Sequence, residues 1–157
     1  MNPRASVDID APIERVWAVM IDTGAYDEWN PFVVRAECAS PPKVGDPIKL
    51  HVRWANGRGT TSPERITELD PPQNDGDVRR ATLAYVYEGL PSKLGLVRGT
   101  RYQRLSQPKG GPTTYETVEE FSGPLVPLAG PKRVEDGFRR HAAALKVRCE
   151  ELAATEL

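Results

Sequence analysis

The stretch at residues 11–32 limits the possible folds most, because it combines a helix start, an amphipathic face and a definite stop. Pro12 suits the first helical position, where its missing N–H has no intrahelical partner anyway, and Glu14 lies near the positive end of the helix dipole. The apolar residues that follow recur at intervals of three and four, which places them on one buried stripe: Ile13, Val16, Trp17, Met20 and Ile21. We therefore expect a helix that begins near Pro12 and ends by Gly24.

A second, shorter helical turn is expected after this helix. Such a turn can carry Tyr26 and Trp29 inward. Pro31 disfavours the helical conformation for Asn30 and so predicts an extended exit. We expect the Asn30 side chain to bond backbone groups there, with contact to a ligand as the alternative. The local pattern is strand, helix, short helix, strand.

Most of the remaining chain, up to residue 121, consists of segments that are typical of strands. They lie at residues 6–9, 32–38, 47–54, 60–69, 79–87, 100–105 and 114–121. Clusters of Gly, Pro, Asn and Asp at residues 56–59, 71–76 and 108–112 favour tight turns. Consecutive strands joined by short turns predict an antiparallel meander. Its alternation of apolar and polar residues leaves one apolar face, which needs a helical cover.

One long C-terminal helix that begins at the Gly130-Pro131 pair can supply that cover. Its apolar residues recur at spacings of three and four: Val134, Phe138, Ala142, Leu145, Cys149 and Leu152. On the opposite face, Glu135 and Asp136 stand four residues before Arg139 and Arg140. Such a solvated charge ladder stabilises a helix by only tenths of a kcal/mol, so we assign it no function.

Composition narrows the function classes. The chain of 157 residues fits one domain, residues 1–157, and its 21 Lys and Arg against 22 Asp and Glu give a net charge of -1. We therefore expect no nucleic-acid partner and no global attraction to an anionic membrane. No apolar leader or membrane-spanning run is visible, which predicts a cytoplasmic protein without membrane insertion. Cys38 and Cys149 are expected to be reduced core residues, with a disulfide between them as the alternative.

The order and spacing of these features resemble the START-like superfamily, which is related to the birch pollen allergen and includes polyketide cyclase/dehydrase and lipid-transport proteins. The resemblance covers nearly the whole chain and is carried by Ala11-Pro12, Val16-Trp17, Asp22, residues 29–32, Gly45, residues 120–123 and residues 144–146. It implies an α+β helix-grip fold, in which a seven-stranded curved antiparallel sheet wraps a long C-terminal helix. Two short helices lie between the first and second strands of that fold, and an apolar cavity lies between sheet and helix. Because the fold hosts carriers, receptors, cyclases, RNases and chaperone activators, it implies no single activity.

Neither a metal nor a cofactor site is expected. The two histidines, His51 and His141, stand at no recognised ligand spacing from a cysteine or carboxylate. The sequence also has no glycine-rich phosphate loop and no serine nucleophile elbow. His51 is expected to be a solvated surface residue, and His141 to lie at the boundary of the long helix's apolar stripe, with the cavity edge as the alternative.

Several polar and aromatic residues are candidates for lining the cavity. Alternation places Leu83, Tyr85 and Tyr87 on one face, Arg101, Gln103 and Leu105 on another, and Glu116, Val118 and Glu120 on a third. The complete candidate set is Trp54, Tyr85, Tyr87, Leu90, Leu94, Arg101, Gln103, Glu116, Val118, Glu120, Leu125, Phe138 and His141.

Arg101 is the central candidate. By the resemblance, Arg101 stands where relatives often carry histidine, and Tyr85 where they often carry tryptophan. If its face points inward, Arg101 could bind a ligand carboxylate or polarise a carbonyl. The alternative is a buried Arg–Glu pair that satisfies itself and binds nothing.

Two apolar connections, at residues 89–98 and 124–129, are unusual for loops. Loop residues normally lie at the surface, so Leu90, Leu94 and Leu125 should either form the mouth of the cavity or plug the end of the sheet. The function expected from the resemblance is binding or transport of a small hydrophobic or aromatic molecule, such as a lipid, sterol, quinone or polyketide, by a monomer or homodimer. The alternatives are an aromatase/cyclase enzyme and a protein-interaction domain of the chaperone-activator kind. The sequence assigns no catalytic residue.

Overall fold

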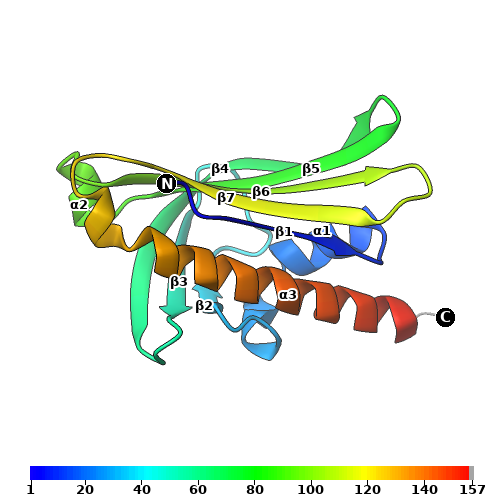
Figure 1. Ribbon diagram of the computed structural model, residues 1–157. Coiled ribbons are helices and arrows are strands. Elements are labelled where there is room, and N and C mark those ends of the chain that lie inside the picture. Colours follow the sequence, from blue (N-terminus) through cyan, green and yellow to red (C-terminus); the bar gives the residue numbers. More distant parts are fainter. Residues whose placement is uncertain (156–157) are drawn as a thin grey trace.

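A seven-stranded antiparallel sheet curls around one long helix in the computed structural model, which describes residues 1–155 (Figure 1). The strand order β1-β7-β6-β5-β4-β3-β2 makes β1 and β2 the two edges. The strands are β1 (Arg4–Ile9), β2 (Val33–Glu37), β3 (Pro47–Arg53), β4 (Gly59–Asp75), β5 (Val78–Tyr87), β6 (Arg98–Pro108) and β7 (Thr113–Ser122). This arrangement confirms the expected helix-grip fold.

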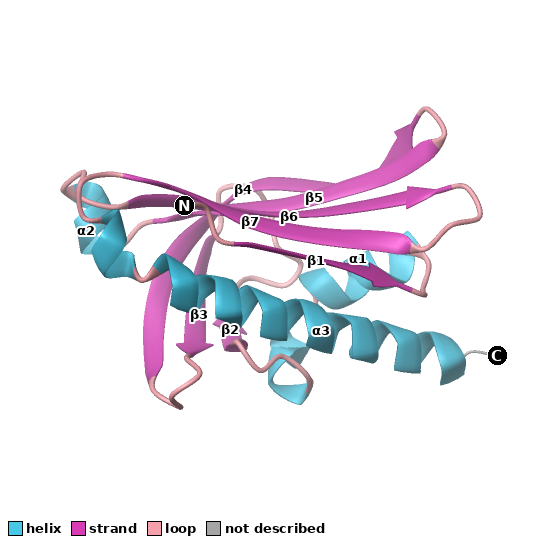
Figure 2. Cartoon of the chain, viewed as in Figure 1, coloured by secondary structure: helices cyan, strands magenta, loops and turns pink. Residues whose placement is uncertain are grey.

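Five helical segments accompany the sheet (Figure 2): α1 (Ile13–Ile21), the 3-10 turn η1 (Thr23–Glu28), α2 (Leu90–Lys93), the 3-10 turn η2 (Val126–Ala129) and α3 (Pro131–Thr155). Pro12 caps α1 from outside rather than occupying its first helical position. Helix α1 ends at Ile21, and Gly24 falls within η1. The Asn30 prediction is confirmed, because its Oδ1 accepts hydrogen bonds from the backbone N–H groups of Phe32 (3.0 Å) and Val33 (2.9 Å).

Strand β4 extends further than the sequence predicted. The residues expected to form a turn at 71–76 instead belong mostly to β4, which runs on to Asp75. The register of β4 against β5 shifts between Asp70 and Gln73. A proline lacks the N–H that a regular ladder needs, and such an irregularity accommodates it. The chain actually reverses at Gly76, whose φ of +64° favours glycine.

Helix α3 covers the concave face of the sheet. Five of its six predicted stripe residues are buried and the sixth, Leu152, is partly buried. Both cysteines are free, as predicted, and burial raises the pKa of the Cys149 thiol to about 12. Within residues 1–155, no helix combines the length and hydropathy needed to cross a membrane.

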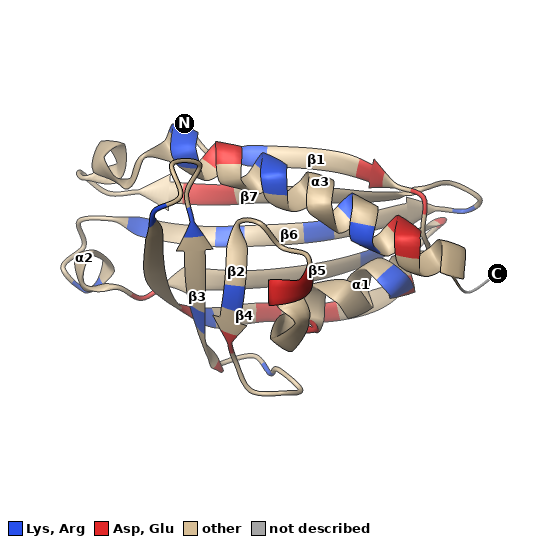
Figure 3. Ribbon diagram, turned by 90° about the horizontal axis from the view of Figure 1, so that it is seen from below, with Lys and Arg blue, Asp and Glu red and all other residues tan. Residues whose placement is uncertain are grey.

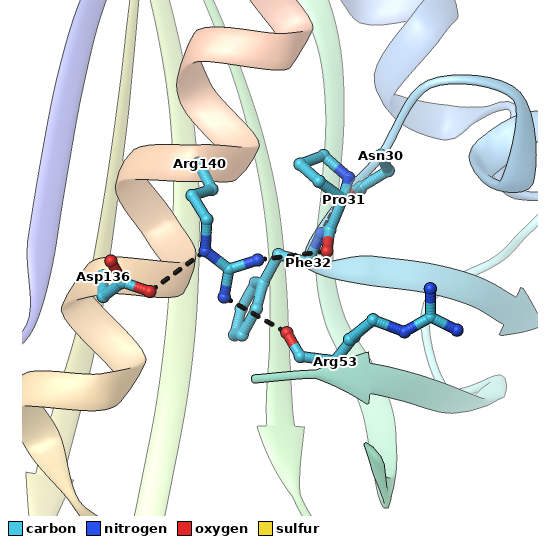
Figure 4. Close-up of polar contacts among 6 residues, drawn as sticks. All are labelled: Asn30, Pro31, Phe32, Arg53, Asp136 and Arg140. Atoms are coloured by element: carbon cyan, nitrogen blue, oxygen red, sulfur yellow. Dashed lines mark hydrogen bonds and ion pairs between the residues drawn. The ribbon is translucent and has the colours of Figure 1, made fainter. Parts of the chain in front are cut away.

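Polar side chains of α3 reach both edges of the sheet. On the β1 side, Lys146 donates to the Asp8 carbonyl (2.8 Å) and Glu135 accepts from the Arg4 backbone N–H (3.1 Å). On the other side, Arg140 donates to the carbonyls of Pro31 and Arg53, each at 3.1 Å (Figure 4). Hydrogen bonds therefore join the helix to both edges of the sheet, in addition to its packing against the concave face.

The predicted charge ladder of α3 is present. Glu135 pairs with Arg139 at 2.8 Å and Asp136 with Arg140 at 3.0 Å. Figure 3 shows acidic and basic residues distributed along the solvent side of this helix. Arg140 has a further role that the spacing did not predict, because its guanidinium also bonds the two carbonyls at the sheet edge.

Candidate functional site

A row of polar side chains crosses the concave face of the sheet beneath α3. Tyr85 on β5 lies opposite Arg101 on β6, and Arg101 lies opposite Glu119 on β7. Residues directly opposite one another in a sheet share a face. Because Arg101 is only 2% exposed and lies over the Phe138 ring of α3, this face is the interior one.

The groups that hydrogen-bond the Arg101 guanidinium are all neutral. Its Nε donates to Thr117 Oγ1 (2.9 Å), its Nη1 to Tyr85 Oη (3.1 Å) and its Nη2 to Tyr115 Oη (3.4 Å). The centre of the guanidinium lies 4.2 Å from the centroid of the Phe138 ring. Among residues 1–155, no carboxylate lies within ion-pair distance of Arg101, so the Arg–Glu pair considered from the sequence is absent as a direct contact, although Glu119 lies opposite Arg101 in the sheet.

His141 on α3 accepts hydrogen bonds in this cluster. Its Nδ1 lies 3.4 Å from Arg101 Nη2 and 3.4 Å from Asn30 Nδ2. Guanidinium and amide nitrogens only donate, so Nδ1 must be the acceptor and the proton of the neutral ring resides on Nε2. Burial, and then the charge of Arg101, hold the pKa of His141 well below its ordinary value. His141 is therefore an uncharged acceptor at neutral pH.

Two glutamates face the same interior. The Oε2 atom of Glu119 is enclosed and is one of two buried side-chain polar atoms in the described chain without a hydrogen-bond partner. Burial, and then the nearby Glu64 carboxylate, raise the pKa of Glu119 to about 8. Glu64 is 6% exposed and accepts a hydrogen bond from Ser62 Oγ at 2.5 Å, yet burial raises its pKa to about 7. Both carboxyl groups thus exchange protons near neutral pH.

The tyrosine hydroxyls connect the cluster to Gln103. Tyr115 Oη donates to Gln103 Oε1 (2.6 Å), and Gln103 Nε2 donates to Tyr85 Oη (3.2 Å). Tyr85 Oη also accepts from Arg101, so its own proton remains for a third group. Burial raises the pKa of Tyr85 to about 12, which keeps that proton in place. The arrangement can donate to a carbonyl or carboxylate oxygen and can exchange a proton beside it.

The two apolar connections meet at one end of the sheet. The backbone N–H of Leu125 donates to the Leu96 carbonyl at 3.0 Å, which joins the loop of α2 to that of η2 (Figure 1). Leu90 and Leu94 are more than 60% exposed, and Leu125 is 36% exposed, so these three candidates face solvent rather than the interior. Trp54 and Tyr87 are partly buried, and the Arg133 guanidinium covers the Trp54 ring at 4.2 Å.

Three residues of β7 that the sequence predicted to line the cavity lie on the convex face of the sheet instead. Glu116 and Glu120 are exposed on the convex side, and Val118 is buried there, outside the main core. The inward residues of β7 are instead Thr117 and Glu119, which lie one position away. Alternation tells which residues share a face but not which face is interior, and β7 is polar on both.

Sequence reasoning missed four residues of the site: Glu64, Tyr115, Thr117 and Glu119. A usable signal exists for Glu119, because the β6–β7 hairpin turns around Gly110 and so brings Arg101 and Glu119 opposite each other. Among the predicted residues, the structure does bring Tyr85, Arg101, Gln103, Phe138 and His141 together. His51 lies away from them, where its Nε2 contacts the Glu37 carboxylate at 2.7 Å.

Two hollows open on the surface away from Arg101. One of about 390 Å³ lies between the β4–β5 and β6–β7 turns and includes Asn74, Arg79 and Lys109 in its lining. The other, of about 160 Å³, lies beside α1 and includes Arg15 and Trp29. Beside the Arg101 guanidinium, the space is occupied by the side chains of Phe138 and His141.

The sequence matches, over residues 3–150, the family described as polyketide cyclase/dehydrase and lipid transport. No curated protein matches the sequence. Among solved structures, the Zhui aromatase/cyclase of a Streptomyces species is 18% identical with a TM-score of 0.69, and the match covers 96% of this chain and 94% of that one.

Two further structures are similar at the level of the fold. A fragment of a STAR-related lipid transfer protein from Xanthomonas axonopodis is 18% identical with a TM-score of 0.65, covering 93% of this chain and 84% of that one. The di-domain ARO/CYC protein BexL is 16% identical with a TM-score of 0.62, covering 98% of this chain. This chain spans only 50% of BexL. At such identities, the likeness establishes the fold alone.

Proposed function

This chain belongs to the polyketide cyclase/dehydrase and lipid transport family, and we propose that it binds a small apolar or aromatic molecule that carries an oxygen-bearing polar group. The molecule lies between the sheet and α3, with Arg101 as its anchor. The observation that carries this proposal is the surroundings of Arg101, a buried cation whose hydrogen-bond partners are three hydroxyls and an imidazole. Burying a cation with no carboxylate in direct contact costs several kcal/mol, and such costs concentrate at functional sites.

The chemistry of the cluster favours a carbonyl or carboxylate oxygen on the ligand. A guanidinium has five N–H groups, and the hydrogen bonds of Arg101 use four of them at most. The Tyr85 hydroxyl accepts from Arg101 and Gln103 and so keeps its own proton available as a further donor beside Arg101. Charge-assisted hydrogen bonds to a ligand oxygen are about twice as strong as neutral ones, so Arg101 would dominate the orientation of the ligand.

Aromatic side chains supply the apolar part of the site. Phe32 packs edge-on against Phe138 at 5.9 Å and against Trp54 at 5.7 Å between ring centroids. The rings extend from Phe138 under Arg101 to Trp54, which is covered by Arg133 in the first turn of α3. Access for a ligand requires the Phe138 side chain or the joined loops to move, as gating segments do in many binding proteins.

The proposal is tested by native mass spectrometry and thermal shift of the purified protein with fatty acids, sterols, quinones and aromatic polyketides. We expect one class to raise the melting temperature, and Arg101→Gln to weaken its binding at least tenfold. The matched control is Arg104→Gln, because Arg104 stands on the same strand but is exposed and lies over Tyr102. Tyr85→Phe keeps the ring and removes the donor, and we expect it to weaken binding severalfold.

Two results would overturn this proposal. One is that no ligand class changes the melting temperature, which would favour the protein-interaction alternative. The other is that folded Arg101→Gln, checked by circular dichroism, binds as well as the unaltered protein.

The Glu119 carboxyl favours an aromatase/cyclase-type enzyme as the second candidate. Its enclosed Oε2 and its pKa of about 8 suit a group that gives and takes protons near neutral pH. In that case Glu119→Gln should abolish turnover of a poly-β-keto substrate while leaving ligand binding intact. Unchanged turnover would reject the role of Glu119.

A further inference from the structure

The two short helical turns at one end of the sheet each present a pair of leucines to solvent. Leu90 and Leu94 of the α2 turn are 68% and 63% exposed, and the Leu94 N–H donates to the Leu90 carbonyl at 3.1 Å. Leu125 and Leu128 of the η2 turn are 36% and 76% exposed, and the Leu128 N–H donates to the Leu125 carbonyl at 3.0 Å. Spacings of four in an α-helix and three in a 3-10 helix place both members of a pair on one face.

These four residues form one surface patch, which we call the leucine end. The Leu125 N–H bonds the Leu96 carbonyl, so the two turns lie side by side, at the end of the molecule where β5 meets α2 (Figure 2). They are the only leucines within residues 1–155 that count as exposed. Four of the seven large apolar side chains that are exposed within residues 1–155 therefore lie at this end.

The two segments that form the leucine end carry basic residues only. The acidic residues next to them in the sequence, Glu88 and Glu135, form ion pairs with Arg65 and Arg139. Residues 89–99 and 122–134 contain no Asp or Glu, although the chain has 22 acidic residues. The same two segments carry four exposed cations: Lys93, Arg98, Lys132 and Arg133. The net charge of -1 for the whole chain conceals this local excess.

We propose that the leucine end docks reversibly onto an anionic lipid surface. The leucine side chains would lie at the boundary between headgroups and acyl chains, and the four cations would face the anionic headgroups. The leucines project from two separate turns. A fluid interface accepts such separated projections, whereas an acidic protein partner needs a complementary rigid surface. The inference stands apart from the proposed ligand site.

The test is co-sedimentation of the whole protein with phosphatidylcholine vesicles, with and without phosphatidylglycerol. We expect binding to the anionic vesicles that weakens as salt is added, because salt screens exposed charges. Lys93→Gln and Lys132→Gln should each lower the partition coefficient about fivefold. Leu94→Ser combined with Leu128→Ser should lower it tenfold or more.

Two matched controls keep the measurement specific. Lys109→Gln removes an exposed cation from the β6–β7 turn, and Val147→Ser removes an apolar residue of α3 that is 55% exposed. Both should bind vesicles as the unaltered protein does. The proposal is overturned if the unaltered protein does not sediment with anionic vesicles. This holds also if the protein binds an acidic protein and the variants lose that binding instead. Equal losses in the controls would overturn it too.

The vesicle assay also separates this inference from the proposed function. Arg101→Gln lies in the interior and should leave vesicle binding unchanged. Conversely, the double leucine variant should keep any ligand-induced rise in melting temperature when no vesicles are present. Either proposal can therefore fail without the other.

Discussion

The two halves of α3 face different interiors. Near its N-terminal end, Phe138 and His141 contact the Arg101 cluster. Further along, Leu145 and Cys149 are fully buried in the hydrophobic core. The second half buries apolar side chains, whereas the first half lies against the buried charge of Arg101. Local departures of this kind are expected at functional sites.

The largest effect is expected from shortening a side chain in the apolar half. Leu145→Ala should lower the free energy of unfolding by about 4 kcal/mol, because it removes a fully buried side chain and leaves a cavity. Urea denaturation measures the change. Val147→Ala, at an exposed position of the same helix, should cost less than about 0.5 kcal/mol. A similar loss at both positions would mean that α3 does not separate a core face from a solvent face.

The polar half should respond to pH. Below the ordinary pKa of 4.5, Glu119 is protonated in both the folded and the unfolded chain. As the pH rises, the unfolded chain loses this proton first, while the folded chain keeps it up to about pH 8. The folded state therefore loses stability between these values and levels off above them.

Glu119→Gln should remove the share of that pH dependence that belongs to Glu119, about 3 to 4 kcal/mol between pH 5 and pH 8, since one unit of pKa shift corresponds to about 1.4 kcal/mol. The variant should keep the part of the pH dependence that comes from Glu64, whose pKa is about 7. The measurement is urea denaturation across this pH range. Glu116→Gln is the control, because Glu116 lies on the convex face of the same strand. An unchanged slope in Glu119→Gln would show that its carboxyl is not held protonated by burial.

The smallest effects are expected on the solvent side of α3. Arg140→Ala should cost about 1.5 kcal/mol, because it leaves two carbonyls at the sheet edge without their donors. Arg139→Ala should cost about 0.3 kcal/mol, since it breaks only the exposed pair with Glu135. Thermal unfolding of both variants measures the difference. Equal costs would mean that the contacts of Arg140 with the sheet edge contribute nothing.

Sequence reasoning was most successful where one face of an element is apolar. The α3 stripe and the strand positions followed from periodicity. Tyr85 followed from alternation on β5, and Arg101 and Gln103 were placed by the face that they share with Leu105 on β6. Alternation did not identify the interior face of β7, because polar residues occur on both faces of this strand. Glu119 was therefore missed, although it lies opposite Arg101.

Two further features were hidden from the sequence for other physical reasons. Pro71 and Pro72 looked like a turn, but the irregular pairing of β4 with β5 accommodates them within a strand. The leucine end was hidden because a net charge averages over the chain, whereas a surface patch depends on which loops meet in space. Local composition becomes informative only once the topology is known.

The contacts of β1 also determine the order in which this chain can fold. Strand β1 lies between β7 and α3, and the hydrogen bond from the Arg4 N–H to Glu135 joins residues 131 positions apart. Contacts of such long sequence separation require closing a large loop, which slows folding. During synthesis the first strand waits without its partners until β7 and α3 have been made, and its docking against them is the step that completes the domain.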